Sequence, residues 1–339
     1  MRKIILVCVT SLQSFLFAQT FPFEGDYSIA VHSLHGIEYD GTFGDITTQN
    51  SDLLKHTDSI HQGTDFVPAE DKVDIVAMLD GVVEDVFAEP GRVQNGITYS
   101  GSPQYGGQIV IRHDNGLLTF YGRLSKVLVK IGDTVTEGQK IGELDKDFKS
   151  VGYYESGYHL HFEIIIDPFD ENSAKLGIDG LPMKSYDTRN IVGVENIYES
   201  GVWSHGSFIG YRDSFSDNQG GQVKSNFHRG SDITVPESMQ PSIYAFSDGV
   251  IHSHYTTNKR LMNGEYLYGN KVFGGCIMIE HEGGYYSMYA HLSDTAGPEN
   301  SEVKKGDYIG IMGNTGLSSG QHLHFQMNYD PVEYFEKVK

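Results

Sequence analysis

His228-Arg-Gly-Ser-Asp232 opens an ordered set of short motifs that continues with Tyr289-Ala-His-Leu-Ser293 and ends with His322-Leu-His-Phe325. The same order occurs earlier in the chain, in His61-Gln-Gly-Thr-Asp65, Tyr121-Gly-Arg-Leu-Ser125 and His159-Leu-His-Phe162. Corresponding members are separated by 167 (228 − 61), 168 (291 − 123) and 163 (324 − 161) residues. A motif set repeated at nearly constant spacing indicates a tandem duplication. The first copy carries Arg123 where the second carries His291.

The duplication predicts two domains, because 339 residues correspond to about two units of roughly 100–200 residues each. We expect a signal peptide over residues 1–18, an N-terminal segment over 19–36, a first domain over 37–169, a connector over 170–200 and a second domain over 201–339.

Short apolar segments favour an all-β fold for both copies. Examples are Gln108-Ile-Val-Ile-Arg112, Cys276-Ile-Met-Ile-Glu280 and Tyr285-Tyr-Ser-Met-Tyr289. They are rich in β-branched and aromatic residues and are bounded by turn formers. Forty glycines against ten prolines also suit many tight turns, and no long segment with a 3.6-residue apolar period follows residue 18. Each copy is therefore predicted to be a β-sandwich or β-barrel unit.

The first residues are typical of an export signal. A basic start at Arg2 and Lys3 precedes the apolar run Ile4-Ile-Leu-Val-Cys-Val9, and Ala18 offers a small residue for cleavage. We therefore expect an exported protein of the periplasm or the extracellular space. No later stretch reaches the ~20 continuous apolar residues of a transmembrane helix.

Charge and cysteine content narrow the function classes. The net charge of −20 becomes −22 without the signal (23 basic and 45 acidic residues), and no cluster of Lys and Arg is visible. Binding to nucleic acid is therefore not expected. Removal of the signal also removes Cys8 and leaves Cys276 alone, which excludes an intramolecular disulfide. Cys276 is expected to be a small buried apolar residue.

The histidine spacings are informative if the motifs lie in strands, because residues two or four apart in a strand point to the same face. His322 and His324 then project together, as do His228 and Asp232 if Gly230 keeps their segment extended. Catalytic zinc usually has three protein ligands and leaves one position for water. Three of these four groups can serve as ligands, which leaves one histidine beside the metal. The pattern therefore predicts a Zn²⁺ site.

Together these motifs make the second copy resemble the lysostaphin-type, LytM-like zinc metallopeptidases, which cut peptide cross-links of bacterial peptidoglycan. The resemblance extends from about Trp203 to Tyr329. The matching elements are Phe208-Ile-Gly-Tyr-Arg212, His228-x-Gly-x-Asp232, Ala245-Phe-Ser-Asp-Gly-Val250, Tyr289-Ala-His-Leu-Ser293, Val303-Lys-Lys-Gly-Asp307 and Gly313-Asn-Thr-Gly-Leu-Ser-Ser-Gly-Gln-His-Leu-His-Phe325. It implies two antiparallel LytM-like domains in tandem.

Transferred residue by residue, the resemblance implies that His228, Asp232 and His324 bind zinc and that His291 and His322 are the catalytic pair. Either of the two catalytic histidines can be the general base. An unligated imidazole near neutral pKa can take and return protons or stabilise an oxyanion.

The first copy, about Ile37 to Ile166, resembles the same family but departs from it. His61, Asp65 and His161 form a second, degenerate candidate metal site, and His159 lies beside them in the pattern. Arg123 stays protonated and cannot act as a base. We therefore expect a first domain with little or no hydrolytic activity.

Two function classes follow. The first is an exported zinc endopeptidase that cuts peptidoglycan stem peptides or cross-bridges. The alternative is a nonenzymatic LytM-type envelope regulator that binds peptidoglycan or activates an amidase. That class normally lacks several site residues, whereas the second copy keeps all five, which favours the enzyme. A peptidase acting on a host or matrix protein would show the same motif residues.

Overall fold

The computed structural model describes residues 19–29, 31–34, 37–40, 61–87, 92–94, 97–99, 107–147, 158–183, 204–207, 209–211, 215–216, 222–223, 227–235, 239–256, 259–262, 265–268 and 272–338. The expected signal peptide over residues 1–18 lies outside these ranges. Among the described residues, no helix is both long enough and apolar enough to span a bilayer.

The first half is built on an antiparallel sheet in the order β6-β9-β10-β14, and β4 lies on the remaining edge of β14. These strands are β4 (Thr64–Pro68), β6 (Gly81–Phe87), β9 (Gly107–His113), β10 (Leu117–Leu124) and β14 (Leu160–Ile166). Beside them are β5 (Lys72–Val76), β11 (Lys126–Val127), β12 (Thr134–Val135) and β13 (Lys140–Asp145). In β6 the buried positions alternate with more exposed ones, as expected for a strand that covers a core on one face.

The second half repeats this arrangement strand by strand. Its sheet runs β22-β25-β26-β30, with β20 on the remaining edge of β30. The strands are β20 (Ser231–Thr234), β21 (Ser242–Tyr244), β22 (Gly249–Thr256), β25 (Gly275–His281), β26 (Tyr285–Leu292), β27 (Asp294–Thr295), β28 (Glu302–Val303), β29 (Tyr308–Ile311) and β30 (His322–Tyr329). The expectation of an all-β fold with two tandem antiparallel units is confirmed.

Shorter elements complete the described chain. They are β1 (Tyr27–Ile29), β2 (Val31–Leu34), β3 (Ile37–Asp40), β7 (Arg92–Gln94), β8 (Ile97–Tyr99), β15 (Ser204–Ser207), β16 (Gly210–Tyr211), β17 (Phe215–Ser216), β18 (Gln222–Val223), β19 (Phe227–His228), β23 (Lys259–Met262), β24 (Glu265–Tyr268), the 3₁₀ helix η2 (Glu171–Leu176) and the α-helix α1 (Pro331–Val338).

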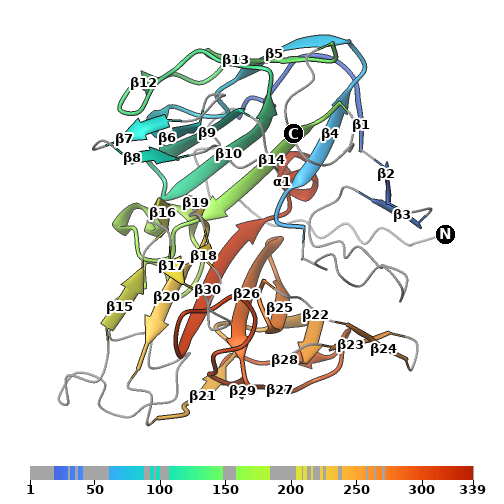
Figure 1. The fold of residues 1–339 in the computed structure, drawn as a ribbon, viewed down its shortest axis with the longest axis vertical. Helices are drawn as coiled ribbons and strands as arrows, with labels where there is room; N and C mark the ends of the chain where they lie inside the picture. The colour runs from blue at the N-terminus through green and yellow to red at the C-terminus, as the bar shows by residue number, and fades with distance from the viewer. Residues whose placement is uncertain are drawn as a thin grey trace, which may run out of the picture.

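The two halves meet where β14 pairs with β30, so that one sheet passes through both (Figure 1). The register joins Ile165 to Asn328, Ile164 to Tyr329 and Ile166 to Met327. With the offset of 163 residues between the two strands, Ile165 corresponds to Asn328, and Ile164 and Ile166 correspond to Met327 and Tyr329. Each strand therefore makes the same contact with its counterpart, as across the twofold axis of a symmetric dimer.

Apolar packing also crosses the junction. Phe335 of α1, in the second half, stacks on Phe162 of β14 with ring centroids 6.0 Å apart. It also contacts Phe21 of the N-terminal segment at 4.8 Å. These side chains belong to or pack against one continuous core cluster that includes residues of both halves. The N-terminal segment further pairs β1 with β4, so it is packed onto the first half.

The beginning of the expected connector is ordered against the first half. Asp170 caps η2 by accepting a hydrogen bond from the Asn172 amide, and Gly177 ends the helix with φ +70°. Left-handed φ favours glycine at a helix C-terminus. Beyond it, Met183 is buried, and its backbone N–H donates to the Pro168 carbonyl at 2.7 Å.

A series of hydrogen bonds between buried polar side chains occurs in both halves. His113 donates from Nδ1 to the Asp80 carbonyl at 2.9 Å, and its Nε2 lies 2.8 Å from the Thr119 hydroxyl, which is hydrogen-bonded to Tyr121. The counterparts in the second half are His281, Asp248, Ser287 and Tyr289. Burial lowers the pKa of both histidines, against the opposing hydrogen bonds from the backbone carbonyls, and brings that of His113 to about 4.

Candidate metal centres

Three side chains converge in the second half. His228 Nε2 lies 3.0 Å from His324 Nδ1, Asp232 Oδ1 lies 3.2 Å from His228 Nε2, and Asp232 Oδ1 lies 3.0 Å from His324 Nδ1. All three residues are buried. Ligands about 2.0–2.1 Å from a tetrahedral zinc ion lie about 3.3 Å from one another. The donor set and the spacing therefore fit zinc.

Strand pairing creates this convergence. Asp232 of β20 is directly opposite His324 of β30, and His228 precedes Asp232 by one short bend at Gly230. A Cβ atom on Gly230 would lie 2.7 Å from both Cε1 and Nε2 of His324, and 2.7 Å from the Phe325 carbonyl oxygen. The central glycine of the His-x-Gly-x-Asp motif thus leaves room for the ring of His324, a candidate ligand, which packs against its backbone.

The Asp232 carboxylate is held in its charged form. Burial raises its pKa, but hydrogen bonds and the coulombic interaction with His228 and His324 outweigh burial and place the pKa well below the ordinary value. A carboxylate that stays ionised between two imidazoles is suited to binding a divalent cation.

His291 lies beside this cluster in a left-handed backbone conformation, with φ +63°. It follows Ala290, which is opposite His324 in the ladder of β26 and β30. Its Nδ1–H donates to the Thr315 carbonyl at 2.8 Å, so Nε2 carries the lone pair in the neutral ring. Burial, reinforced by His322 and His324, holds the pKa of His291 well below its ordinary value.

His322 completes the group, with its ring centroid 4.6 Å from that of His291. Its Nδ1–H donates to the Gly320 carbonyl at 2.8 Å, and the Ser318 hydroxyl lies 3.2 Å from the same nitrogen. Its Nε2 lies 3.6 Å from Asp232 Oδ1. The structure thus brings all five expected residues of the second half into one buried cluster.

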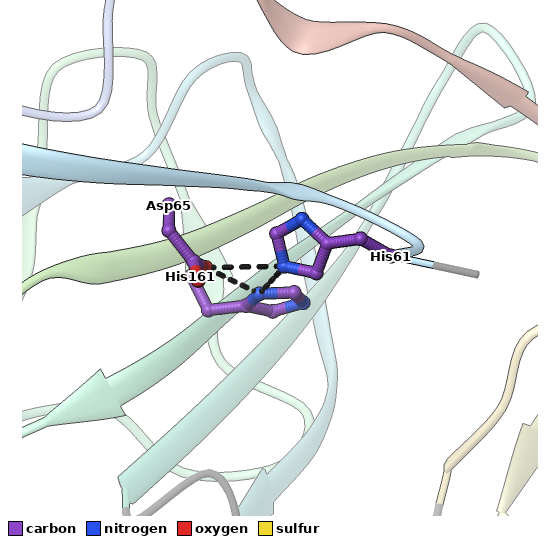
Figure 2. Close-up of side chains that lie close together, drawn as sticks. All are labelled: His61, Asp65 and His161. Atoms are coloured by element: carbon purple, nitrogen blue, oxygen red, sulfur yellow. Dashed lines mark hydrogen bonds and ion pairs between the residues drawn. The ribbon is translucent and has the colours of Figure 1, made fainter. Parts of the chain in front are cut away.

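The first half reproduces the three-residue cluster. Figure 2 shows His61, Asp65 and His161 pointing toward one another, with His61 Nε2 3.2 Å from His161 Nδ1 and Asp65 Oδ1 2.7 Å from His161 Nδ1. The distance from His61 Nε2 to Asp65 Oδ1 is 3.4 Å. His61 is partly exposed, in contrast to its buried counterpart His228. These residues also fit a metal ion in donor type and spacing.

The neighbours of this cluster differ from those of the second half. His159 corresponds to His322, and its Nε2 lies 3.5 Å from Asp65 Oδ2. Arg123 corresponds to His291 in structure as well as in sequence, since it follows Gly122, which is opposite His161, and has φ +66°. The strained backbone position is therefore retained, while the side chain is a permanent cation.

Sequence reasoning did not identify the partners behind the metal-facing histidines. His161 Nε2–H donates to Glu163 Oε1 at 2.8 Å, and His324 Nε2–H donates to Gln326 Oε1 at 3.3 Å. Each partner lies two residues beyond its histidine on the same strand. The alternation of side chains in a strand is the signal that could have revealed them, since it places both partners on the face of the ligands.

The fold and these clusters define an all-β protein with one His-Asp-His candidate metal centre in each repeated half. Residues 59–173 and residues 226–334 each match Peptidase family M23. Together the two regions cover more than half of the chain, which therefore belongs to this family, with one copy of the family domain in each half.

Individual relatives match shorter stretches. The chain is 36% identical over 107 residues to the DD-carboxypeptidase/endopeptidase Mpg of Neisseria meningitidis. It is 33% identical over 106 residues to the peptidoglycan DD-endopeptidase ShyC of Vibrio cholerae. Each alignment covers 31% of this chain and 21% of the relative, so the chain spans about a fifth of the length of these curated relatives.

Two solved structures are also similar. The catalytic domain of the antimicrobial peptidase lysostaphin from Staphylococcus simulans is 25% identical, with 40% of this chain and 92% of that domain covered and a TM-score of 0.28. A zinc-containing peptidase from Vibrio cholerae is 18% identical, with 66% of this chain and 53% of that chain covered and a TM-score of 0.28.

Proposed function

We propose that the second half of this chain is an exported zinc endopeptidase that hydrolyses peptide cross-links of bacterial peptidoglycan. The observation that carries the proposal is the buried cluster in which His228, Asp232 and His324 face one another while His291 and His322 lie beside them. Membership of Peptidase family M23 supports a peptidase. The relative from Vibrio cholerae named above, a peptidoglycan DD-endopeptidase, supports peptidoglycan as the substrate.

His228, Asp232 and His324 would hold the zinc ion. When bound, zinc would polarise the scissile carbonyl and lower the pKa of a bound water molecule to about 7.

His291 and His322 supply proton transfer at Nε2. Both donate Nδ1–H to a backbone carbonyl, which fixes the orientation of each ring and leaves Nε2 as the acceptor in the neutral form. The lowered pKa of His291 keeps it neutral near pH 7. A neutral imidazole can accept a proton from water and return it to the leaving amine. Either histidine can fill this role.

We infer that the first half hydrolyses peptides poorly or not at all. Its cluster of His61, Asp65 and His161 fits a metal ion, but Arg123 stands at the position of His291. A guanidinium remains protonated at every physiological pH and cannot accept a proton. The first half keeps only one of the two candidate proton acceptors, His159 at the position of His322, and the loss of the other supports a binding or positioning role for this half.

The test combines metal content with hydrolysis. The chain purified without its signal should contain at least one zinc per molecule and should release peptides from purified sacculi, identified by mass spectrometry. Sacculi with different cross-link chemistry would show which bond is cut. Asp232→Ala should lose both zinc from the second half and hydrolysis. A chain that cannot be loaded with zinc, or a loaded chain that releases no peptide from any sacculus, would rule out the enzyme and favour the nonenzymatic regulator.

A further inference from the structure

The last candidate ligand of each half, His161 or His324, is hydrogen-bonded by a buried side chain on its own strand. Glu163 accepts from His161 Nε2 in the first half, and Gln326 accepts from His324 Nε2 in the second. In both rings Nδ1 faces the other two ligands. A hydrogen bond at Nε2 sets the tautomer that leaves the Nδ1 lone pair for a metal.

Each of these two partners is in turn held by the opposite half. Arg229 Nε lies 2.8 Å from Glu163 Oε1 and 2.6 Å from Glu163 Oε2. Gln62 Nε2 donates to Gln326 Oε1 at 3.2 Å. Gln62 follows the ligand His61, and Arg229 follows the ligand His228. The residue beside the first ligand of one half therefore supports the last ligand of the other.

The pairing of β14 with β30 explains this exchange. The register is symmetric about Ile165 and Asn328, and Glu163 and Gln326 each precede this centre by two residues. A self-complementary interface makes every contact twice, once in each direction. The duplication has kept both contacts but has made them chemically different, because one is an ion pair and the other joins two amides.

The charged pair is well shielded. Glu163 is 0% exposed and Arg229 is 7% exposed, and the guanidinium carbon lies 4.6 Å from the ring centroid of Phe120. Arg229 Nε lies within hydrogen-bonding distance of both Glu163 oxygens, and Oε1 also accepts from His161 Nε2. Removal of either charge would take from the other the opposite charge that it contacts in the buried pair.

The neutral pair has a defined orientation. The Gln326 NH₂ group donates to Asn328 Oδ1 at 2.7 Å, so its Oε1 is directed to His324 and receives the second donor from Gln62. Loss of Gln62 would remove one of the contacts that fix this amide.

We propose that the two metal centres are coupled, because a residue of each half holds the side chain that hydrogen-bonds a candidate ligand histidine of the other half. Gln62 positions His324 through Gln326, and Arg229 positions His161 through Glu163. Both are positioning residues. The inference rests on the ligand sets proposed above, and it gives the noncatalytic first half a direct role at the catalytic site.

The experiment measures zinc affinity in the full chain by competition with a chromophoric chelator, one site at a time. Asp65→Ala leaves the second site to be measured, and Asp232→Ala leaves the first. In the Asp65→Ala background, Gln62→Ala should weaken zinc binding about tenfold, at the lower end of the 10–100-fold typical of outer-shell partners. In the Asp232→Ala background, the same change should leave the first site unaltered, although Gln62 adjoins His61.

Arg229→Gln should show the opposite pattern. It should weaken the first site about 10–100-fold and leave the second unaltered, although Arg229 adjoins His228. The double variant Arg229→Gln with Glu163→Gln creates in the first half the amide pair that the second half already has. It should therefore recover most of the lost affinity, which a merely structural role for Arg229 does not predict.

Arg112→Gln is the control, because Arg112 is a less buried arginine whose ion pairs, with Glu84, Asp167 and Asp170, all lie within its own half. It should alter neither site.

An effect of Gln62→Ala on the first site only, or equally on both sites, would overturn the coupling. If Arg229→Gln does not fold, the zinc affinities of Gln62→Ala and of the double variant still test the coupling. Zinc binding that persists in Asp65→Ala with Asp232→Ala would instead overturn the ligand assignment.

Discussion

His291 is the residue at which the proposed proton transfer and the proposed metal binding can be tested separately. Its Nδ1 is engaged by the Thr315 carbonyl, and it is not among the three residues whose atoms face one another as ligands. His291→Ala should therefore keep zinc and lose about 10²–10⁴-fold in turnover, the usual contribution of a proton-transfer group. Zinc analysis and release of peptides from sacculi test this together. A near-normal rate in the variant would show that His291 has no role in proton transfer.

Gly230 tests the packing of the ligand cluster. A Cβ at this position would lie 2.7 Å from the His324 ring and from the Phe325 carbonyl, so the ring or the backbone of β30 must shift. Gly230→Ala should lower the zinc affinity of the second site by at least about tenfold. The control is Gly320→Ala, where a Cβ would meet nothing within 4 Å. Equal affinities in the two variants would contradict the close packing.

At the scale of elements, the buried chain of His113, Thr119 and Tyr121 ties β9 and β10 to the start of β6. The pKa of His113 falls to about 4 because burial disfavours the charged ring, with only partial opposition from the Asp80 carbonyl. The unfolded histidine titrates near 6.5. Below that pH the unfolded chain binds a proton that the folded chain excludes, so the free energy of unfolding falls as pH drops from 6.5 toward 4 and is unaffected above 6.5.

The difference between these two pKa values corresponds to about 3 kcal/mol, of which about half should be lost by pH 5. Urea unfolding at several pH values between 7.5 and 5, with a chelator present, measures this loss. His113→Asn cannot take up a proton and should show a shallower dependence on pH than the natural chain. Because the other titrating groups remain, the comparison isolates His113, and identical slopes would contradict the assignment.

At the scale of the whole molecule, the two halves share one sheet and one core. β14 pairs with β30, and Phe335 of α1 packs against Phe162 of the first half. We therefore expect the metal-free chain to unfold in a single transition whose calorimetric and van't Hoff enthalpies agree. Phe335→Ala should destabilise this one transition by about 3–5 kcal/mol. Two separate calorimetric transitions, of which only one shifts, would show that the halves are independent.

Much of the fold and of the candidate sites could be predicted from the sequence. The all-β class followed from short alternating segments. The convergence of His228, Asp232, His322 and His324 followed from spacings that place side chains on one face of a strand, and the resemblance to the family added His291. The equivalence of Arg123 and His291 was also visible, and the structure gives both residues the same left-handed backbone. These properties depend on local periodicity and on repetition, which a linear sequence records directly.

The tertiary structure alone decided how the two copies meet. The pairing of β14 with β30 joins strands far apart in the chain, and its register depends on which side chains pack together in space rather than on any local pattern. From that register follow the contact of Arg229 with Glu163 and that of Gln62 with Gln326. The sequence by itself determined two similar repeated units with two similar sets of candidate ligands. Only the antiparallel junction of β14 with β30 brought a residue of each half into contact with the side chain that supports a candidate ligand in the other half. Both contacts occur because a symmetric interface makes each contact in both directions.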